Sequence, residues 1–475
     1  MTFKQFLLGL QSLRAVSPAL AFFGAALVLV AMPRRWSAAA APAVLLFAGF
    51  FGLLMMLVGD PPKLPERTDL VIDRLSVLTP IWLTILLPVM AACVLRSESP
   101  SRGLAAAGVM LSFGGLSFAA AARTISLLYV ALTIAVAGAA ASGASSEPDQ
   151  RGNQFFARSC VAMLLLWGLF SVGLLVSSTN APAIEHQSPN SPILQPPSRM
   201  VGVALTSIAI LGLLGAAPWS LWLSRGPVGP VANVRTLQLL TGCLAYLKLR
   251  PTVGSSEVQS IVWVLALGSA AFSVWSTMRR STANAAFSAV SLIASIAGGV
   301  LLVDPGLEPS PRSTGALALL LSLSLASPSL SAALAACQIN TAGSLGRPQG
   351  GRGLGLRLAL YLLLGLPLSF GFWAWWTVMM SPPEVGGIAG KRQVAVGLGT
   401  VAVVFVGLRF LYLWARLKER PALQPTDEDR WQVAASIYGA AILITIGCWP
   451  RPIFAALGDL LTVAAPEMPV APLKP

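Results

Sequence analysis

Few side chains in this sequence have the types and spacing that metal or cofactor chemistry requires. The one histidine is His186, and the five cysteines lie far apart without a Cys-x-x-Cys pair. Zinc, haem and iron–sulfur sites need several such ligands close together. We therefore predict no cofactor and no metal site on this chain. The cysteines are predicted to be small buried side chains in apolar stretches.

Four basic residues in or beside apolar stretches are stronger candidates for a functional role. Arg235 begins one apolar run, Lys248 and Arg250 end the same run, and Arg409 lies deep in a later one. Arg235 is a candidate contact for an anion, a lipid headgroup or a carboxylate of a neighbouring subunit, and the other three are candidate functional or partner contacts. The alternative for the first three is an interfacial side chain that extends toward the bilayer surface. For Arg409 the alternatives are a contact between helices and a remnant of a hydrated path.

The elements that position these residues are long apolar segments. Of the 475 residues, 55% are hydrophobic and 11% are charged, whereas soluble domains carry about 25% charged residues. About 20 apolar residues suffice for a helix that crosses a bilayer. We predict an all-α polytopic membrane protein of about fourteen transmembrane helices, which excludes a soluble enzyme. The predicted spans are 17–32, 40–58, 76–95, 103–121, 124–142, 156–177, 201–223, 231–249, 257–277, 283–303, 314–338, 354–379, 391–415 and 432–449, followed by a short amphipathic segment at 452–464.

The formal net charge of +14 comes from basic residues in short loops beside the apolar spans. This distribution is typical of membrane topology determination and not of nucleic-acid binding. The loops after the odd-numbered spans hold the larger share of Lys and Arg, so that side is predicted to be cytoplasmic. The N-terminus is then outside, in a multi-pass protein of the cell inner (plasma) membrane.

Two predicted spans contain helix breakers in related settings. One reads Leu-Gly-Ala-Ala-Pro-Trp-Ser at 214–220, with Pro218, and the other reads Leu-Gly-Leu-Pro-Leu-Ser at 364–369, with Pro367. These are the seventh and twelfth spans, and an odd separation reverses their orientation. Paired interrupted helices in inverted halves mark the translocation site of many transporters. The alternative is that Gly and Pro are simply common in membrane helices.

Several short segments, spread over about 300 residues, add to this pattern. They are Asp-Arg-Leu-Ser at 73–76, Pro-Trp-Ser-Leu-Trp-Leu at 218–223, Pro-Val at 230–231, Tyr-Leu-Lys-Leu-Arg at 246–250, Arg-Arg at 279–280, and Gly-Leu-Pro followed by Gly-Phe-Trp between 365 and 373. Their order and spacing resemble the antiporter-like membrane subunits of NADH–quinone oxidoreductase and of multisubunit cation/proton antiporters, which favours the transporter interpretation of the two breaks.

The resemblance implies a single transmembrane domain, 1–475, built from two inverted five-helix repeats with discontinuous helices 7 and 12. The N-terminal helices cover 1–121, the first repeat 103–249 and the second repeat 257–415. The last helix and tail cover 416–475.

The resemblance also implies where a line of ionisable residues would carry protons at mid-membrane. In this sequence those positions hold Thr133, Leu213, Trp375 and a window between Thr236 and Gly242, none of which titrates. The predicted proton path is therefore lost. Asp73 is predicted to cap the third helix, and the tryptophans near Trp375 are predicted to pack.

The leading hypothesis is a membrane-arm subunit of an NADH–quinone oxidoreductase-like proton-translocating complex, with its own proton path lost. NADH, flavin and iron–sulfur chemistry would then lie on partner subunits, and the other contacts of the chain are with lipid. The first alternative is a subunit of a cation/proton antiporter or of an inorganic-carbon uptake complex. The second is a structural spacer in a membrane arm.

Overall fold

The structure is a computed structural model of the chain. It describes residues 16–57, 70, 73–95, 99–143, 150–179, 197–216, 228–253, 256–279, 282–303, 310–337, 346–347, 351–381, 404, 418–419 and 427–463.

The described elements are helices, apart from one two-residue strand pair. The first half contains α2 (Ser17–Ala31), α3 (Arg34–Leu57), α4 (Arg74–Leu95), α5 (Ser99–Ala121), α6 (Ile125–Ser142), α7 (Gln150–Thr179) and α8 (Pro197–Leu213). The second half contains α10 (Val228–Val253), α11 (Ser256–Arg279), α12 (Thr282–Val303), α13 (Pro311–Ala336), α14 (Gly351–Leu363), α15 (Phe370–Met380), α17 (Asp427–Cys448) and α18 (Pro450–Val463). Strands β1 (Gly346–Arg347) and β2 (Lys418–Glu419) pair in parallel.

Among the described residues, seven helices are long and apolar enough to cross a membrane, and five further apolar helices are shorter. The helix α10 belongs to neither group because polar side chains, Asn233, Arg235 and Gln238 among them, interrupt its apolar sequence. The predicted all-α polytopic membrane fold is confirmed.

The predicted spans agree with the helices in order. The first eleven spans correspond to α2 through α13, the twelfth is divided into α14 and α15, and the last corresponds to α17. The predicted amphipathic segment is α18. The predicted span 391–415 lies outside the described residues, except for Val404.

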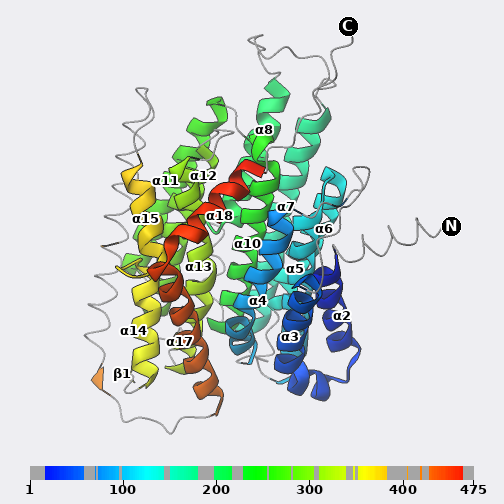
Figure 1. The fold of residues 1–475 in the computed structure, drawn as a ribbon, viewed down its shortest axis with the longest axis vertical. Helices are drawn as coiled ribbons and strands as arrows, with labels where there is room; N and C mark the ends of the chain where they lie inside the picture. Colours follow the sequence, from blue (N-terminus) through cyan, green and yellow to red (C-terminus); the bar gives the residue numbers. More distant parts are fainter. Residues whose placement is uncertain are drawn as a thin grey trace, which may run out of the picture.

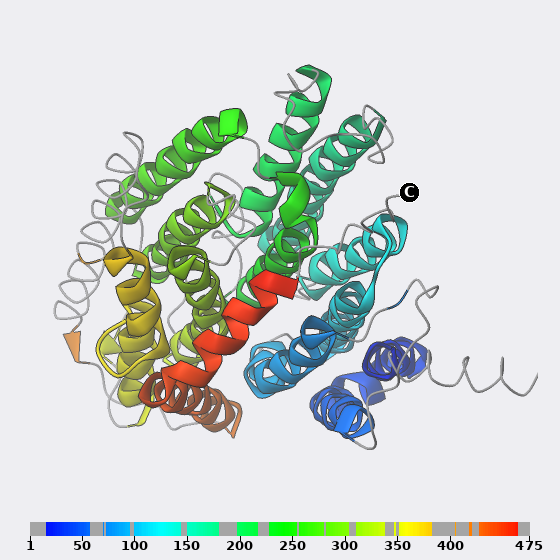
Figure 2. The same cartoon turned by 45° about the horizontal axis from the view of Figure 1, so that its top comes forward.

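Two helices occupy the centre of the bundle, and both are buried along nearly their whole length. The helix α10 packs against α4, α5, α6, α8 and α13, while α13 packs against α12, α14, α15 and α17. The N-terminal helices α2 and α3 lie at one side of the bundle, and α18 runs obliquely across it from the end of α17 (Figures 1 and 2). The side chains on α10 therefore face protein on all sides.

The helices α8 and α14 end in the same type of hydrogen-bonded turn. After α8, the N–H of Gly215 donates to the Gly212 carbonyl (3.0 Å) and that of Ala216 to Leu211 (3.2 Å). After α14, the N–H of Gly365 donates to Leu362 (3.1 Å) and that of Leu366 to Tyr361 (3.3 Å).

These bonds define a Schellman motif, which needs a left-handed residue after the helix. Gly215 and Gly365 supply it, with φ values of 97° and 61°. The twelfth predicted span is therefore a discontinuous helix, because α15 begins after the turn. The chain beyond the first turn, at 217–227, lies outside the described residues.

Candidate functional site

The turn after α8 places Leu213 in the middle of packed protein. Leu213 is fully buried, and so is Leu214 beside it. Gly298 of α12 lies close to the same turn, since a Cβ on it would be 3.0 Å from Leu214 Cδ1. The position where the resemblance expects a proton-carrying lysine is thus enclosed by aliphatic side chains.

Gly242 of α10 meets the backbone of this turn directly. A Cβ on Gly242 would be 2.7 Å from the Leu214 nitrogen and 2.9 Å from the Leu213 carbonyl carbon. Backbone atoms cannot move aside as the end of a flexible side chain can, so only glycine fits here. The structure therefore brings together two of the positions predicted from the sequence, Leu213 and Gly242.

Gln238, about one helical turn before Gly242, stabilises the same break. Its side chain is 1% exposed, and its Nε2 donates to the Gly212 carbonyl at 2.8 Å. Its Oε1 has no hydrogen-bond partner among the described residues. Sequence reasoning marked the window between Thr236 and Gly242 but missed this residue. The amide side chain of Gln238 between leucines was the feature of the sequence that could have indicated a buried hydrogen bond.

Other neutral polar groups lie along the same part of the bundle. Asn233 and Thr236 of α10 are buried, and their side-chain polar atoms lack hydrogen-bond partners within the described part of the chain. Ser269 of α11 and Ser295 of α12 share a hydrogen bond of 2.6 Å. Buried groups of this kind commonly bind water, but none of them takes up or releases a proton near neutral pH.

Arg235 connects α10 to α12. It is 5% exposed, its Nη1 donates to the Phe287 carbonyl at 2.8 Å, and its guanidinium carbon lies 5.0 Å from the centre of the Phe287 ring. These contacts hold the side chain within the protein. An arginine keeps its proton at any physiological pH, so Arg235 is not a proton relay.

Trp375 of α15 closes the second break. It is buried, and a Cβ on Gly365 would lie 2.8 Å from its Cδ1, so the indole packs over the turn after α14. Its neighbour Trp373 donates from Nε1 to the Gly447 carbonyl of α17 at 2.8 Å. Both indoles therefore make packing contacts, as predicted, and the expected lysine or glutamate position carries an apolar ring.

The turn between α14 and α15 is held from several sides. The Tyr361 hydroxyl donates to the Pro367 carbonyl, and the Ser369 hydroxyl caps α15 by accepting the Phe372 N–H at 3.2 Å. Leu368 has a φ of 70°, which is unfavourable for a residue with a side chain. Pro367 is thus part of a tightly folded helix break.

Thr133 of α6 is half-buried and makes only a local bond in the helix. Its hydroxyl donates to the Tyr129 carbonyl at 2.7 Å. The Tyr129 hydroxyl and the Ser171 hydroxyl of α7 lie 2.9 Å apart. The position where the resemblance expects a glutamate is therefore occupied by a threonine, whose hydroxyl donates to a carbonyl of its own helix.

Lys248 connects the end of α10 to two other segments. Its Nζ lies 3.7 Å from Asp73 Oδ2 and donates to the Ala122 carbonyl at 3.1 Å. Asp73 also accepts the Ser76 N–H at 2.8 Å through Oδ1. The prediction that Asp73 caps the third helix, α4, is therefore confirmed, and Lys248 neutralises that cap.

Arg250 attaches α18 to the bundle. It is 6% exposed, and its Nη1 donates to the Leu461 carbonyl in the last turn of α18 at 2.7 Å. A cation at this end satisfies a free carbonyl and interacts favourably with the helix dipole. Arg74 and Asp459 form an ion pair between α4 and α18. Two other predicted site residues, Pro218 and Arg409, lie outside the described residues.

Within the described part of the chain, α8, α10, α12, α14 and α15 contain no Asp, Glu or His. The buried charged side chains in this part of the protein are Arg235 and Arg250. The carboxylate of Asp73 lies at the start of α4, and that of Asp459 lies on α18, where it pairs with Arg74. Within the same residues no three His, Cys, Asp or Glu side chains are grouped to hold a metal ion.

Comparison with known proteins places this geometry among membrane complexes. No protein-family model matches the sequence, and no curated protein matches it. Solved structures do match over nearly the whole chain. A chain of the Mrp complex from Dietzia sp. DQ12-45-1b has a TM-score of 0.72 and 14% identity, covering 97% of this chain and 98% of that one.

Two respiratory complexes contain similar chains. A chain of the membrane-bound sulfane sulfur reductase, an archaeal respiratory membrane complex, has a TM-score of 0.71 and 14% identity, covering 95% of this chain and 98% of that one. A chain of respiratory complex I from Thermus thermophilus has a TM-score of 0.66 and 17% identity, covering 93% and 99%. The protein therefore has the fold of an antiporter-like membrane subunit, as its sequence motifs predicted.

Proposed function

We propose that this chain is a membrane-arm subunit of an NADH–quinone oxidoreductase-like proton-translocating complex, and that it has lost its own proton path. The chain is embedded in a plasma membrane with its N-terminus outside. Its partners are other membrane subunits, and the redox cofactors belong to partner chains. Its role is to complete the membrane arm structurally.

The observation that carries this proposal is the closure of both helix breaks by groups that cannot titrate. Leu213 and Gly242 meet at the first break, and Trp375 covers the second. A proton relay through a membrane needs ionisable groups close enough to exchange protons through water. Among the described residues, the buried polar groups of α10 near the first break are the amides of Asn233 and Gln238, the hydroxyl of Thr236 and the guanidinium of Arg235.

The cost of membrane charges explains why a non-conducting subunit would hold such residues. A charged side chain at the bilayer centre costs about 2.5–3.5 kcal/mol on insertion scales. Without proton transfer there is no functional gain to offset that cost. Aliphatic and aromatic residues at positions 213 and 375 then improve packing.

The two Schellman turns support the proposed repeats at 103–249 and 257–415. The same pair of hydrogen bonds, with glycine in the same place, ends α8 and α14. In transporters built from inverted repeats, discontinuous helices occupy corresponding positions in the two halves. The repeated turn is therefore the expected remnant of an inverted-repeat transporter.

The second candidate function is a subunit of a cation/proton antiporter or of an inorganic-carbon uptake complex. The similarity to a chain of the Mrp complex is as extensive as that to the respiratory complexes. The missing titratable groups count against this function too, because ion exchange also needs them. The partner subunits distinguish the two candidates.

The experiment is co-purification of the tagged chain from its native membranes in a mild detergent, with mass spectrometry of the bound proteins. Recovery of flavoprotein, iron–sulfur and quinone-site subunits is the expected result. Recovery of small membrane proteins alone, or of a soluble zinc protein, would instead favour the second candidate. Recovery of no stable partner would contradict both.

A further inference from the structure

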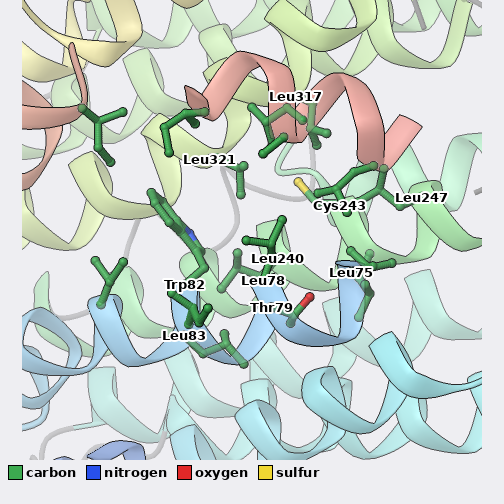
Figure 3. Close-up of a pocket in the computed structure, with 18 of the residues that line it drawn as sticks. Leu75, Leu78, Thr79, Trp82, Leu83, Leu240, Cys243, Leu247, Leu317 and Leu321 are labelled. Carbon is green, nitrogen blue, oxygen red and sulfur yellow. The ribbon is translucent and has the colours of Figure 1, made fainter. Parts of the chain in front are cut away.

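An apolar cavity lies beneath α18, and its lining reaches Cys243 of α10 and Phe370 of α15. Its volume is about 330 Å³, and its walls come from α4, α10, α13, α15, α17 and α18. Figure 3 shows leucines of α4, α10 and α13 around this space, with α18 along one side. The lining residues include Leu75, Leu78, Trp82, Cys243, Leu317 and Leu321.

The lining offers almost nothing to a polar ligand or to water. The Trp82 Nε1 is used by a hydrogen bond of 2.9 Å to the Ser324 hydroxyl, and the Thr445 hydroxyl donates to the Ala441 carbonyl at 2.7 Å. A buried water needs two to four polar partners, whereas purely apolar cavities bind apolar molecules. The ligand for this space is therefore a hydrocarbon group.

The shape of the cavity suits a chain rather than a compact molecule. Its lining on α4 extends from Leu75 to Ile85, which is about 15 Å along a helix at 1.5 Å per residue. Thr445 on α17 is exposed and Ile81 on α4 is half-buried, so the cavity is open to the outer surface of the bundle. In a membrane protein that surface contacts lipid.

Paired charges lie at one end of the cavity, where Arg74 pairs with Asp459 and Lys248 lies 3.7 Å from Asp73. Leu75 lies at the start of α4, next to Arg74, and Lys248 lies one residue after the lining residue Leu247. Charged side chains at the ends of membrane helices lie in the headgroup region, so the polar end of a bound lipid would lie at this end. The hydrocarbon part of the same molecule would then lie along α4.

From these contacts we propose that the cavity is a binding site for one acyl chain of a phospholipid, which fills the space between α4, α13 and α18. An empty apolar space loses the dispersion contacts of its walls, and an acyl chain restores them. The bound chain then supports α18, which crosses above the cavity and is attached to the bundle by Arg250 and by the Arg74–Asp459 ion pair. This site is independent of the function proposed above.

The test uses the tagged chain reconstituted in phosphatidylglycerol vesicles that contain a phosphatidylglycerol with a diazirine on one acyl chain. After illumination, cross-linked peptides are mapped, and native mass spectrometry counts the phospholipid retained after detergent washing. We expect cross-links on α4 and α13 in the cavity and one retained phospholipid. Leu321→Trp fills the cavity and should abolish both signals.

Leu165→Trp is the matched control, because Leu165 lies on α7, is largely exposed, and does not line the cavity. It should leave both signals unchanged. If Leu321→Trp lowers the thermal transition of the protein, Leu78→Phe on the opposite wall replaces it. Unchanged cavity cross-links in the filled variant, or retention of an isoprenoid quinone or of no lipid by the unmodified chain, would overturn the proposal.

Discussion

At Gly242 the absence of a side chain lets the backbone of α10 touch the turn after α8. Gly242→Ala places a Cβ within 2.9 Å of two backbone atoms. Overpacking of this kind costs about 1–3 kcal/mol. We expect a lower thermal unfolding temperature in detergent for this variant, measured by the loss of monodisperse protein on heating.

Gly168→Ala is the control for that measurement, because no atom lies within 4 Å of a Cβ at position 168. Alanine is the better helix former, so this variant should be as stable as the unmodified chain or slightly more so. Equal unfolding temperatures for the two variants would show that α10 and the α8 turn are not in contact.

At Leu213 a single substitution should not restore proton transfer. Leu213→Lys adds one titratable group, but position 242 has no room for a second, and Trp375 and Thr133 remain. We expect proton flux into proteoliposomes to equal that of the unmodified chain. Flux that rises in this variant would mean that the rest of a path is still present.

The two helix breaks were predictable from the sequence, because glycine and proline interrupt helices through their own backbone properties. Gly215 and Gly365 were expected at helix breaks, and both have positive φ. The role of Gln238 was not predictable in this way. Its bond to the Gly212 carbonyl depends on the rotation of α10 against α8, which only the packed structure determines.

Among the elements, α18 is attached to the bundle by a hydrogen bond from Arg250 as well as by packing. Arg250→Gln removes a charge-assisted hydrogen bond to the Leu461 carbonyl, and such bonds contribute about 1.5–3 kcal/mol. We expect faster amide hydrogen exchange in α18, measured by mass spectrometry. Arg357→Gln changes an exposed arginine on α14 and should leave exchange in α18 unaltered.

The ion pair between Arg74 and Asp459 should matter much less to the same helix. Both side chains are about half exposed or more, at 60% and 49%, and exposed pairs contribute about 0–1 kcal/mol. Asp459→Asn should therefore increase hydrogen exchange in α18 less than Arg250→Gln does. A larger increase for Asp459→Asn than for Arg250→Gln would show that the ion pair stabilises α18 more than the Arg250 hydrogen bond does.

The helix α18 was predicted from the sequence, but its contact with the bundle was not. The amphipathic segment predicted at 452–464 is α18, at Pro450–Val463. Its attachment was not predicted, because Arg250 and Leu461 are 211 positions apart. Sequence alone favoured an interfacial position for Arg250, whereas the structure buries it under a second helix.

For the whole molecule, the fold is similar to that of chains from large membrane complexes, and its described central helices α10 and α13 contain no Asp, Glu or His. The predicted order of spans was correct because apolar length is a direct requirement of the bilayer. The span predicted at 231–249 corresponds to α10, although polar side chains lower the mean hydropathy of this helix. The packing of α10 and α13 against their neighbours was not predicted, because it depends on contacts between segments far apart in the sequence.

The most direct test of a closed proton path measures proton flux through the complex that co-purifies with this chain, reconstituted in liposomes and driven by a potassium diffusion potential. The compared chains are the unmodified one and Gln238→Leu, which removes the buried amide at the first break. The account predicts equal flux per complex, with equal recovery of partners as the control. A clear fall in flux in Gln238→Leu would show that protons pass through this chain and would contradict the account.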